Sequence, residues 1–337
     1  MEAYLWESIG EGQIRCRLCS HRCRIKAGKR GLCNVRENVD GRLRSRVYGN
    51  VVARNVDPIE KKPLFHVLPG SLSYSIATVG CNFRCRFCQN ADIAQLPADR
   101  DGRIVGHFTA PEEVVRGARE TGCASIAYTY TEPTVYFEFA FDTAKIASEN
   151  GVRNVFVTNG YMTPEAIEMA APVLDAANVD LKAFSDKFYK EMCAARLAPV
   201  LETLKEMKRL GVFVEVTTLI IPGANDDPAE LKDLADFLVR DLGPETPWHI
   251  SRFHPTYKLT DRPPTPVETL RQARDIGLSA GLRYVYTGNV PGEAAESTFC
   301  HHCGQRLIQR WGLTVRSNRA KDGKRPGCGA VVEGIWK

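Results

Sequence analysis

The sequence lacks the features that carry a chain into a membrane or a secretory pathway. No apolar run in its 337 residues approaches the about 18 residues that a membrane-spanning helix needs. The opening segment, MEAYLWESIGEG, has no basic stretch followed by an apolar one, so we expect no signal peptide. Hydrophobic residues make up 44% of the chain and charged residues 25%, which is typical of a globular protein. We therefore expect no membrane association and, by default, a cytoplasmic location.

Cysteine, in contrast, is abundant and clustered. Ten of the 12 cysteines fall into three groups, which are Cys16, Cys19, Cys23 and Cys33, then Cys81, Cys85 and Cys88, then Cys300, Cys303 and Cys328. Disulfides are uncommon in a reducing cytosol, and pairs spaced C-x2-C are typical of metal sites. The groups therefore predict metal binding, whereas the isolated Cys123 and Cys193 are expected to be buried packing residues.

Positive charge gathers near both ends of the chain. Residues 13–54 hold 12 Lys and Arg against 2 Asp and Glu, and residues 300–337 hold 8 against 2, although the net charge of the whole chain is only +5. Two interpretations are open. Either the basic ends bind nucleic acid, an acidic protein or another anionic substrate, or they partly compensate the clustered thiolates.

From residue 70 the chain alternates strand-like and helix-like segments. The predicted strands are 73–79, 124–130, 152–158, 178–184, 212–221, 248–253 and 282–288, and the predicted helices between them include 112–120, 134–150 and 228–240. Such alternation implies parallel strands joined by right-handed crossovers. Neither G-x-G-x-x-G nor G-x4-G-K-[ST] follows the first strand, which disfavours a nucleotide-binding doubly wound sheet. We predict an α/β fold with a partial (β/α)6, TIM-like barrel at 70–290, a cysteine-rich metal-binding region at 1–69 and a zinc-ribbon-like region at 291–337.

The first predicted strand leads into VGCNFRCRFCQN, residues 79–90, where three cysteines are spaced C-x3-C-x2-C. Structural zinc normally has four protein ligands, so three thiolates leave one position open. A [4Fe–4S] cluster with three irons held by protein and the fourth free for a substrate or cofactor suits this arrangement. We therefore predict a catalytic cluster at Cys81, Cys85 and Cys88, provided that no fourth cysteine folds into the site.

This segment resembles the cluster motif of the radical S-adenosylmethionine (SAM) superfamily, in which C-x3-C-x-aromatic-C follows the first strand, with Phe87 at the aromatic position. The resemblance implies that SAM binds the open iron. It also implies that reduction by a one-electron donor such as flavodoxin or ferredoxin yields a 5′-deoxyadenosyl radical, which abstracts hydrogen from the substrate. TYTEP stands where many members have Gly-Gly-Glu-Pro, so Thr131 and Glu132 are implied SAM contacts. Asn159, after the third strand, is an implied contact of the SAM carboxylate or ribose.

Longer segments narrow the resemblance. DPIEKKPLFHVLPGS (57–71), PWHISRFHPTYKL (247–259) and YVYTGNVPG (284–292) resemble the radical SAM enzyme of the AmmeMemoRadiSam system, which is related to pyruvate formate-lyase activating enzymes. This resemblance implies AMMECR1-like and Memo-like proteins as partners, and hydrogen abstraction from a protein glycine as one candidate reaction. It implies no specific substrate.

Four polar side chains at predicted strand ends are candidates for catalysis. Asp180 and Lys182 alternate on the fourth strand and share a face where charge is costly unless it is paired or functional. The alternative is a structural ion pair that closes the barrel. Arg252 and His254 mark the end of the sixth strand, where they would hold the substrate or the SAM carboxylate. The alternative for Arg252 is a buried pair with an acidic neighbour.

The spacing of the cysteines near the two ends does not determine which metal they bind. The first group, C-x2-C-x3-C-x9-C, offers four thiolates to zinc or to an auxiliary [4Fe–4S] cluster. In the last group, FCHHCG and GCG resemble two knuckles of a zinc ribbon, but Arg325 stands where the second pair would place a cysteine. His301, His302 or another residue would then complete a zinc site.

The leading hypothesis is a SAM-dependent radical enzyme, and two other classes are kept as alternatives. A zinc-ribbon module that binds nucleic acid is disfavoured because the basic ends have few aromatic residues on which bases would stack. A protein that only transfers electrons through an iron–sulfur cluster would need neither an open iron nor a barrel.

Overall fold

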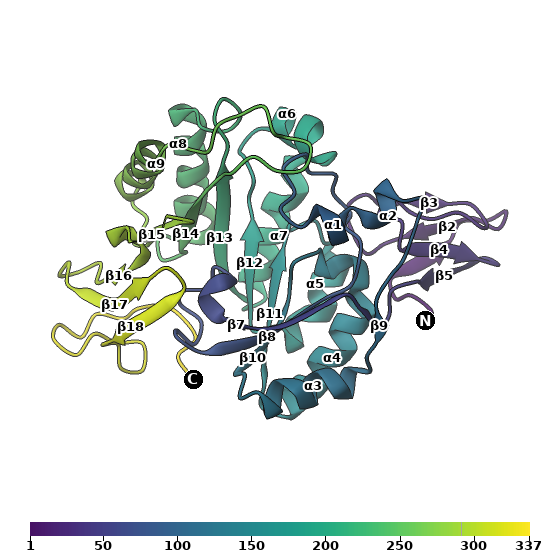
Figure 1. Ribbon diagram of the computed structural model, residues 1–337, viewed down its shortest axis with the longest axis horizontal. Helices are drawn as coiled ribbons and strands as arrows, with labels where there is room; N and C mark the ends of the chain where they lie inside the picture. Colours follow the sequence, from purple (N-terminus) through teal and green to yellow (C-terminus); the bar gives the residue numbers. More distant parts are fainter. Residues whose placement is uncertain (291) are drawn as a thin grey trace.

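A single eight-stranded sheet forms the centre of the computed structural model, which describes residues 1–290 and 292–337 (Figure 1). The strand order is β15-β14-β13-β12-β11-β10-β8-β7. These strands are β7 (Ala53–Pro58), β8 (Leu72–Ala77), β10 (Ser125–Tyr128), β11 (Arg153–Thr158), β12 (Ala176–Asp180), β13 (Phe213–Ile220), β14 (Trp248–Arg252) and β15 (Val285–Gly288). Neighbours from β8 to β15 are parallel, whereas β7 pairs antiparallel with β8.

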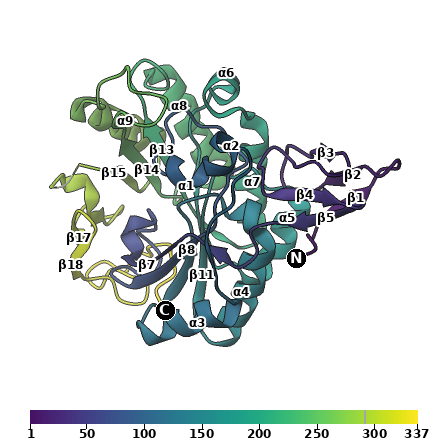
Figure 2. The same ribbon diagram turned by 45° about the vertical axis from the view of Figure 1, so that its right-hand side comes forward.

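Helices alternate with the parallel strands and surround them (Figure 2). They are α1 (Ala91–Ala94), α2 (Leu96–Asp99), α3 (Pro111–Glu120), α4 (Phe137–Glu149), α5 (Pro164–Ala170), α6 (Asp186–Phe188), α7 (Leu197–Arg209), α8 (Pro228–Phe237) and α9 (Val267–Ala280). Proline stands at the first position of α3, α5 and α8, where its fixed φ favours a helix start. The two edge strands, β7 and β15, lie at opposite ends of the order, so the barrel is incomplete. The predicted partial barrel is confirmed.

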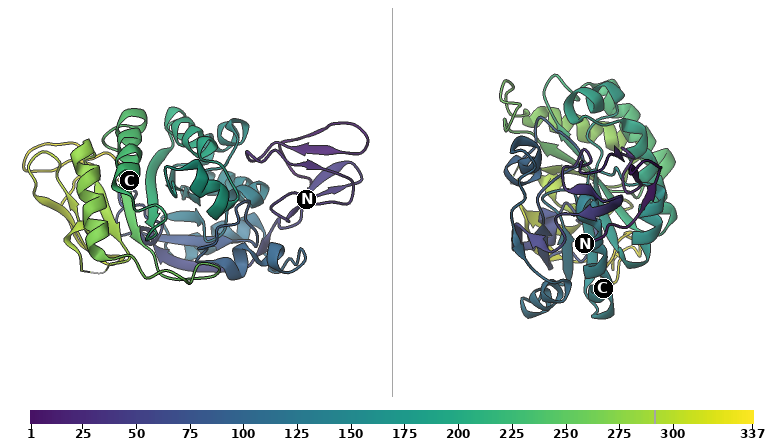
Figure 3. Two further views of the ribbon diagram at one scale, coloured as in Figure 1. Left: turned by 90° about the horizontal axis from the view of Figure 1, so that it is seen from above. Right: turned by 90° about the vertical axis from the view of Figure 1, so that its right-hand side faces the viewer.

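Two small antiparallel regions flank the central sheet on opposite sides (Figures 1 and 3). The N-terminal one contains the sheet of β1 (Trp6–Ser8), β2 (Ile14–Cys16) and β3 (Arg24–Ile25) and the hairpin of β4 (Arg36–Val39) and β5 (Arg42–Ser45), and β6 (Asn50–Val51) pairs with β9 (His107–Phe108). The C-terminal sheet consists of β16 (Thr298–Phe299), β17 (Arg306–Trp311) and β18 (Thr314–Asn318). Pro291, where we expect the C-terminal region to begin, lies outside the described residues, and the expected domain limits stay predictions.

The N-terminal region shares a core with the barrel. Ile14, Val35 and Leu43 are fully buried and belong to the same hydrophobic cluster as Val79, which follows β8. Burial of this apolar surface holds the first cysteine group against the start of the second, since each fully buried side chain of this kind contributes about 1.5–3 kcal/mol. Within the described residues, the structure contains no helix long and apolar enough to cross a membrane.

Candidate functional site

The second cysteine group, which we call the triad (Cys81, Cys85 and Cys88), lies in the loop between β8 and α1. All three residues line a cavity of about 750 Å³ at the edge of the sheet where the parallel strands end. Loops at this edge carry the active site in barrel enzymes. The backbone N–H of Arg84 donates to the carbonyl oxygen of Cys193 at 2.8 Å, which holds the loop against the π-helical turn at Tyr189–Cys193.

Cys193 is the candidate for a fourth thiolate, but its side chain does not line the cavity. Its side chain is fully buried, and only the triad supplies cysteines among the described residues that line the cavity. The neighbouring thiol of Cys193, together with burial, raises the pKa of the Cys85 thiol well above its usual value. Cys193 therefore supports Cys85 from behind, and one coordination position in the cavity stays open to another molecule.

Glu132 lines the same cavity directly after β10 and is buried. Its Oε1 accepts hydrogen bonds from the N–H and hydroxyl of Thr134 and from the hydroxyl of Thr158, at 3.0, 2.5 and 2.7 Å. Among the described residues its Oε2 accepts only the N–H of Asn159, at 2.8 Å, which leaves a lone pair for a donor in the cavity. Burial raises the pKa of this carboxyl group, and the hydrogen bonds oppose that rise.

Tyr130 and Thr131, which precede Glu132, form the loop that holds it beside the triad. Tyr130 has a φ of 63°, in the left-handed region that favours glycine, and it occupies a position where the resembling motif has glycine. The hydroxyl of Thr131 donates to the carbonyl oxygen of Thr78 at 2.8 Å, which joins this loop to the end of β8. Thr131 therefore lies beside the triad loop, as the sequence predicts, and lines the cavity.

Asn159 connects this edge to the triad. Its Nδ2 donates to Oδ1 of Asn82 at 2.7 Å and lies 3.8 Å from Sγ of Cys81. Phe87, the aromatic residue of the cysteine motif, is buried and also lines the cavity. The expected cofactor contacts at 87, 131, 132 and 159 thus share one cavity with the triad.

Comparison with known proteins agrees with this geometry. The family model described as the radical SAM superfamily matches residues 75–238, which span β8, the triad loop and the strand ends described above. An uncharacterized protein of Methanocaldococcus jannaschii is 51% identical over 327 residues, which cover 95% of this chain and 96% of that protein. The chain belongs to the radical SAM superfamily.

Two further similarities agree with this assignment. A putative glycyl-radical enzyme activating enzyme of Methanocaldococcus jannaschii is 27% identical over a region that covers 50% of this chain and 68% of that protein. The crystal structure of Streptococcus suis SuiB bound to S-adenosylmethionine has a TM-score of 0.52 and 14% identity, and covers 72% of this chain and 56% of that one. The first supports homology to activating enzymes, and the second shows the fold alone.

Radical SAM proteins of this kind are enzymes that use a [4Fe–4S] cluster and SAM, and the cavity fits both groups. Among the described residues that line the cavity, the triad offers three thiolates and there is no fourth, which would leave one iron for SAM. Oε2 of Glu132 retains an acceptor site for an ammonium group such as that of SAM. The cavity volume is within the about 300–1,000 Å³ that is typical of cofactor sites.

Two Asp–Lys pairs bring charge to the cavity, and the sequence predicts one of them. Lys182 Nζ lies 2.8 Å from Oδ2 of Asp180, and both residues line the cavity. Lys62 Nζ lies 2.7 Å from Oδ2 of Asp57 and 4.5 Å from the ring centroid of Tyr130, whose hydroxyl also donates to Asp57. Burial is the main cause that lowers the pKa of Lys62, to about 8.

Arg252 and His254 do not line the cavity. Arg252 ends β14, but its Nε donates to the carbonyl oxygen of Thr265 at 2.8 Å, and His254 is exposed. Neither is among the described residues that line the cavity, so their catalytic role stays a prediction. Ser251 reaches the cavity instead, where its hydroxyl accepts a hydrogen bond from Nδ2 of Asn289 at 2.9 Å.

The C-terminal cysteines form a compact group. Sγ of Cys328 lies 3.7 Å from that of Cys300 and 3.8 Å from that of Cys303. Nδ1 of His301 lies 3.1 Å from the Tyr284 hydroxyl, so this ring nitrogen already has a partner. Neither His301 nor His302 belongs to the compact group, within the part of the chain that is described, and the fourth ligand stays open.

Sequence reasoning missed several residues at this site. Lys62 and His249 line the cavity, and His249 lies 2.6 Å from the buried carboxylate of Glu215 on β13. A charged residue in the middle of an apolar strand is the signal that could have identified Glu215, because a buried charge needs a partner. The local sequence does not distinguish Lys62 from its neighbour Lys61, which is exposed.

The triad loop contains a glycine, Gly80, at a position where a larger side chain would clash with its neighbours. It has a φ of 108°, and an added Cβ would lie 2.7 Å from Cγ1 of the buried Val35. We expect Gly80→Ala to lower the free energy of unfolding by about 2–5 kcal/mol, from left-handed strain plus overpacking, and to reduce iron loading. Gly122→Ala is the matched control, because Gly122 also has positive φ (67°) but open space around it. Urea unfolding and iron content measure both variants, and equal losses would contradict the steric explanation.

Proposed function

We propose that this radical SAM enzyme cleaves SAM reductively and uses the resulting 5′-deoxyadenosyl radical to abstract hydrogen from a substrate, as in the AmmeMemoRadiSam enzymes that its sequence resembles. The cluster, when bound at the triad, supplies the electron that cleaves SAM to methionine and the radical. A one-electron donor of the flavodoxin or ferredoxin class delivers that electron. The observation that carries the proposal is the shared cavity, in which three thiolates, the free lone pair of Glu132 and Asn159 lie together.

Each residue has a role that its contacts support. The triad holds three irons and leaves one open. Glu132 accepts the ammonium group of SAM through Oε2, while its hydrogen bonds to Thr134 and Thr158 fix the carboxylate in place. Asn159 orients the loop beside Cys81 through its amide contact with Asn82. These groups position SAM and leave the bond cleavage to the cofactor.

The two Asp–Lys pairs mark the part of the cavity where the substrate would lie. Asp180, Lys182 and Lys62 line the cavity, and Lys62 is paired with Asp57 behind the lining. A polar substrate therefore suits the cavity better than an apolar one. Homology to activating enzymes supports a backbone segment of a protein as the substrate class. AMMECR1-like and Memo-like proteins are the proposed partners. Zinc at Cys300, Cys303 and Cys328 is proposed from their spacing.

The test is anaerobic reconstitution with iron and sulfide, followed by addition of SAM and dithionite. We expect 5′-deoxyadenosine and methionine, measured by mass spectrometry. We also expect the EPR signal of the reduced cluster to change when SAM is added, because SAM binds the open iron. A fully loaded, reducible cluster whose signal ignores SAM would exclude the proposal. The EPR measurement needs no substrate, so it remains decisive even if turnover requires one.

A further inference from the structure

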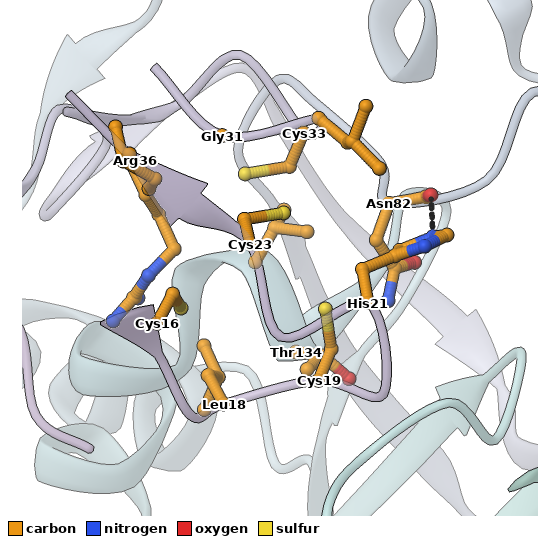
Figure 4. A pocket seen from close by; sticks show the side chains of 13 residues that line it. Cys16, Leu18, Cys19, His21, Cys23, Gly31, Cys33, Arg36, Asn82 and Thr134 are labelled. Carbon is orange, nitrogen blue, oxygen red and sulfur yellow. Dashed lines mark hydrogen bonds between the residues drawn. The ribbon is translucent and has the colours of Figure 1, made fainter. Parts of the chain in front are cut away.

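The first cysteine group, which we call the quartet (Cys16, Cys19, Cys23 and Cys33), surrounds a second and much smaller cavity (Figure 4). Cys16 ends β2 and Cys23 directly precedes β3, so the short antiparallel sheet presents two of the four thiols. The other walls include Leu18, Ile25 and Val135. The four thiols thus come from one region and line a small, mainly apolar cavity.

The spacing of the sulfur atoms distinguishes the quartet from a zinc site. Zinc–thiolate bonds of about 2.3 Å place the sulfurs of a tetrahedral site about 3.8 Å apart. The C-terminal group meets this value, at 3.7 and 3.8 Å. Among the described residues it alone forms a group of sulfurs that all lie within 4.8 Å of one another. In the quartet no three sulfurs are so close, and the same holds for the triad.

The space between the quartet sulfurs also differs from that in a zinc site. The cavity between them has a volume of about 20 Å³, more than the about 10–15 Å³ that one water needs, so the sulfurs are not drawn together around a single ion. A closed zinc tetrahedron leaves no such space, because its sulfurs nearly touch around the metal. In a [4Fe–4S] cluster each thiolate binds a different iron at a different corner, so the sulfurs stand farther apart around a larger core.

Two residues that line this cavity each carry a buried hydrogen-bond donor without a partner in the described part of the chain. Nε of Arg36 and Nδ2 of Asn82 have no partner among the described residues, although the two residues are only 2% and 3% exposed. A buried donor without an acceptor costs about 1–3 kcal/mol. The inorganic sulfides of a cubane cluster, together with the thiolates, are acceptors at different points around the core. N–H groups that donate to cluster sulfurs also tune the reduction potential.

We propose that Cys16, Cys19, Cys23 and Cys33 bind a second [4Fe–4S] cluster, to whose sulfurs Arg36 and Asn82 donate hydrogen bonds. Asn82 directly follows Cys81 of the triad, and its backbone carbonyl oxygen lies 2.9 Å from Nε2 of His21, within the quartet segment. The two clusters are therefore neighbours. The proposal rests on the quartet alone and holds whether or not the triad binds SAM.

The decisive experiment removes the triad and counts metals. The triple variant C81A/C85A/C88A is produced with iron and zinc both in supply and isolated anaerobically, and iron, sulfide and zinc are then measured. We expect about four irons and four sulfides per chain and the EPR signal of a reduced [4Fe–4S] cluster. Zinc without iron in the quartet would overturn the proposal. No SAM is present, so this result is independent of the proposed function.

A further variant tests the proposal even if the protein does not fold without the triad cysteines. In the otherwise unchanged chain, C19S/C23S is expected to lower the iron content from about eight to about four per chain while the triad cluster remains. Unchanged iron in this variant would overturn the proposal.

Asn82→Leu in the triad-free background is expected to make the reduction potential of the quartet cluster more negative, because a donor that stabilises the reduced cluster is lost. Equal potentials with and without this substitution would exclude the hydrogen bond from Asn82.

Discussion

Replacing Cys85 with alanine is expected to reduce the formation of 5′-deoxyadenosine from SAM to the level seen without protein. Two remaining thiolates hold a cubane cluster poorly, and no other cysteine among the described residues lines the cavity. Cys81→Ala and Cys88→Ala are expected to behave alike, because each thiolate binds a different iron. Mass spectrometry of the products and iron analysis on the same sample measure the effect.

Two control variants make this prediction specific. Cys123→Ala removes a buried cysteine near the hydroxyl of Thr121, outside all three cysteine groups, and is expected to keep wild-type activity. The double variant C85A/C193A is included because Cys193 lies beside Cys85 and is a thiol able to replace it. If Cys85→Ala retained product formation and the double variant did not, Cys193 would be a substitute ligand. Retention of activity in both variants would contradict a cluster at the triad.

The parts of the structure that follow from local pattern could be predicted from the sequence. The predicted strand at 152–158 is β11 at Arg153–Thr158, and the predicted helix at 112–120 is α3 at Pro111–Glu120. Period and flanking turn residues determine such elements. The triad spacing is equally local, because eight residues contain all three thiolates. The order of strands then brings Thr131, Glu132 and Asn159 to the same edge as the triad.

Side-chain pairing across long sequence separations could not be predicted in the same way. The contact between Asn159 and Asn82 joins two residues 77 positions apart, and that between Tyr130 and Asp57 joins residues 73 apart. Arg252 illustrates the converse, since its strand ends at the expected edge but its guanidinium is held by a backbone oxygen of residue 265. Strand position therefore predicts the edge of the sheet, while the direction of each side chain depends on tertiary packing.

The buried pair of Arg36 and Glu138 is the long-range contact with the largest expected effect on stability. Nη1 and Nη2 of Arg36 lie 2.8 and 2.9 Å from the two carboxylate oxygens of Glu138, and the side chains are 2% and 0% exposed. Oε1 of Glu138 also accepts the backbone N–H of Tyr4 at 2.8 Å. This carboxylate on α4 thus attaches the N-terminal region to the barrel at two points.

Glu138→Gln is expected to lower the free energy of unfolding by about 3–5 kcal/mol, because it leaves a buried guanidinium without its counter-charge. Asp236→Asn, which removes one partner of the exposed pair with Lys232, is the control and is expected to have little measurable effect. Urea unfolding under anaerobic conditions measures both variants.

The metal state of the quartet should change the size of this effect. The Arg36 side chain also lines the quartet cavity, so a bound group with four thiolates provides a second negative charge beside it. We therefore expect Glu138→Gln to cost more in protein stripped of metal than in loaded protein. A loss below about 1 kcal/mol in the stripped protein would mean that water reaches Arg36, since only a solvated guanidinium tolerates the loss of its partner at so small a cost. An equal loss in both states would mean that the bound group does not interact with Arg36, and the N–H of its Nε would then have no acceptor at the quartet.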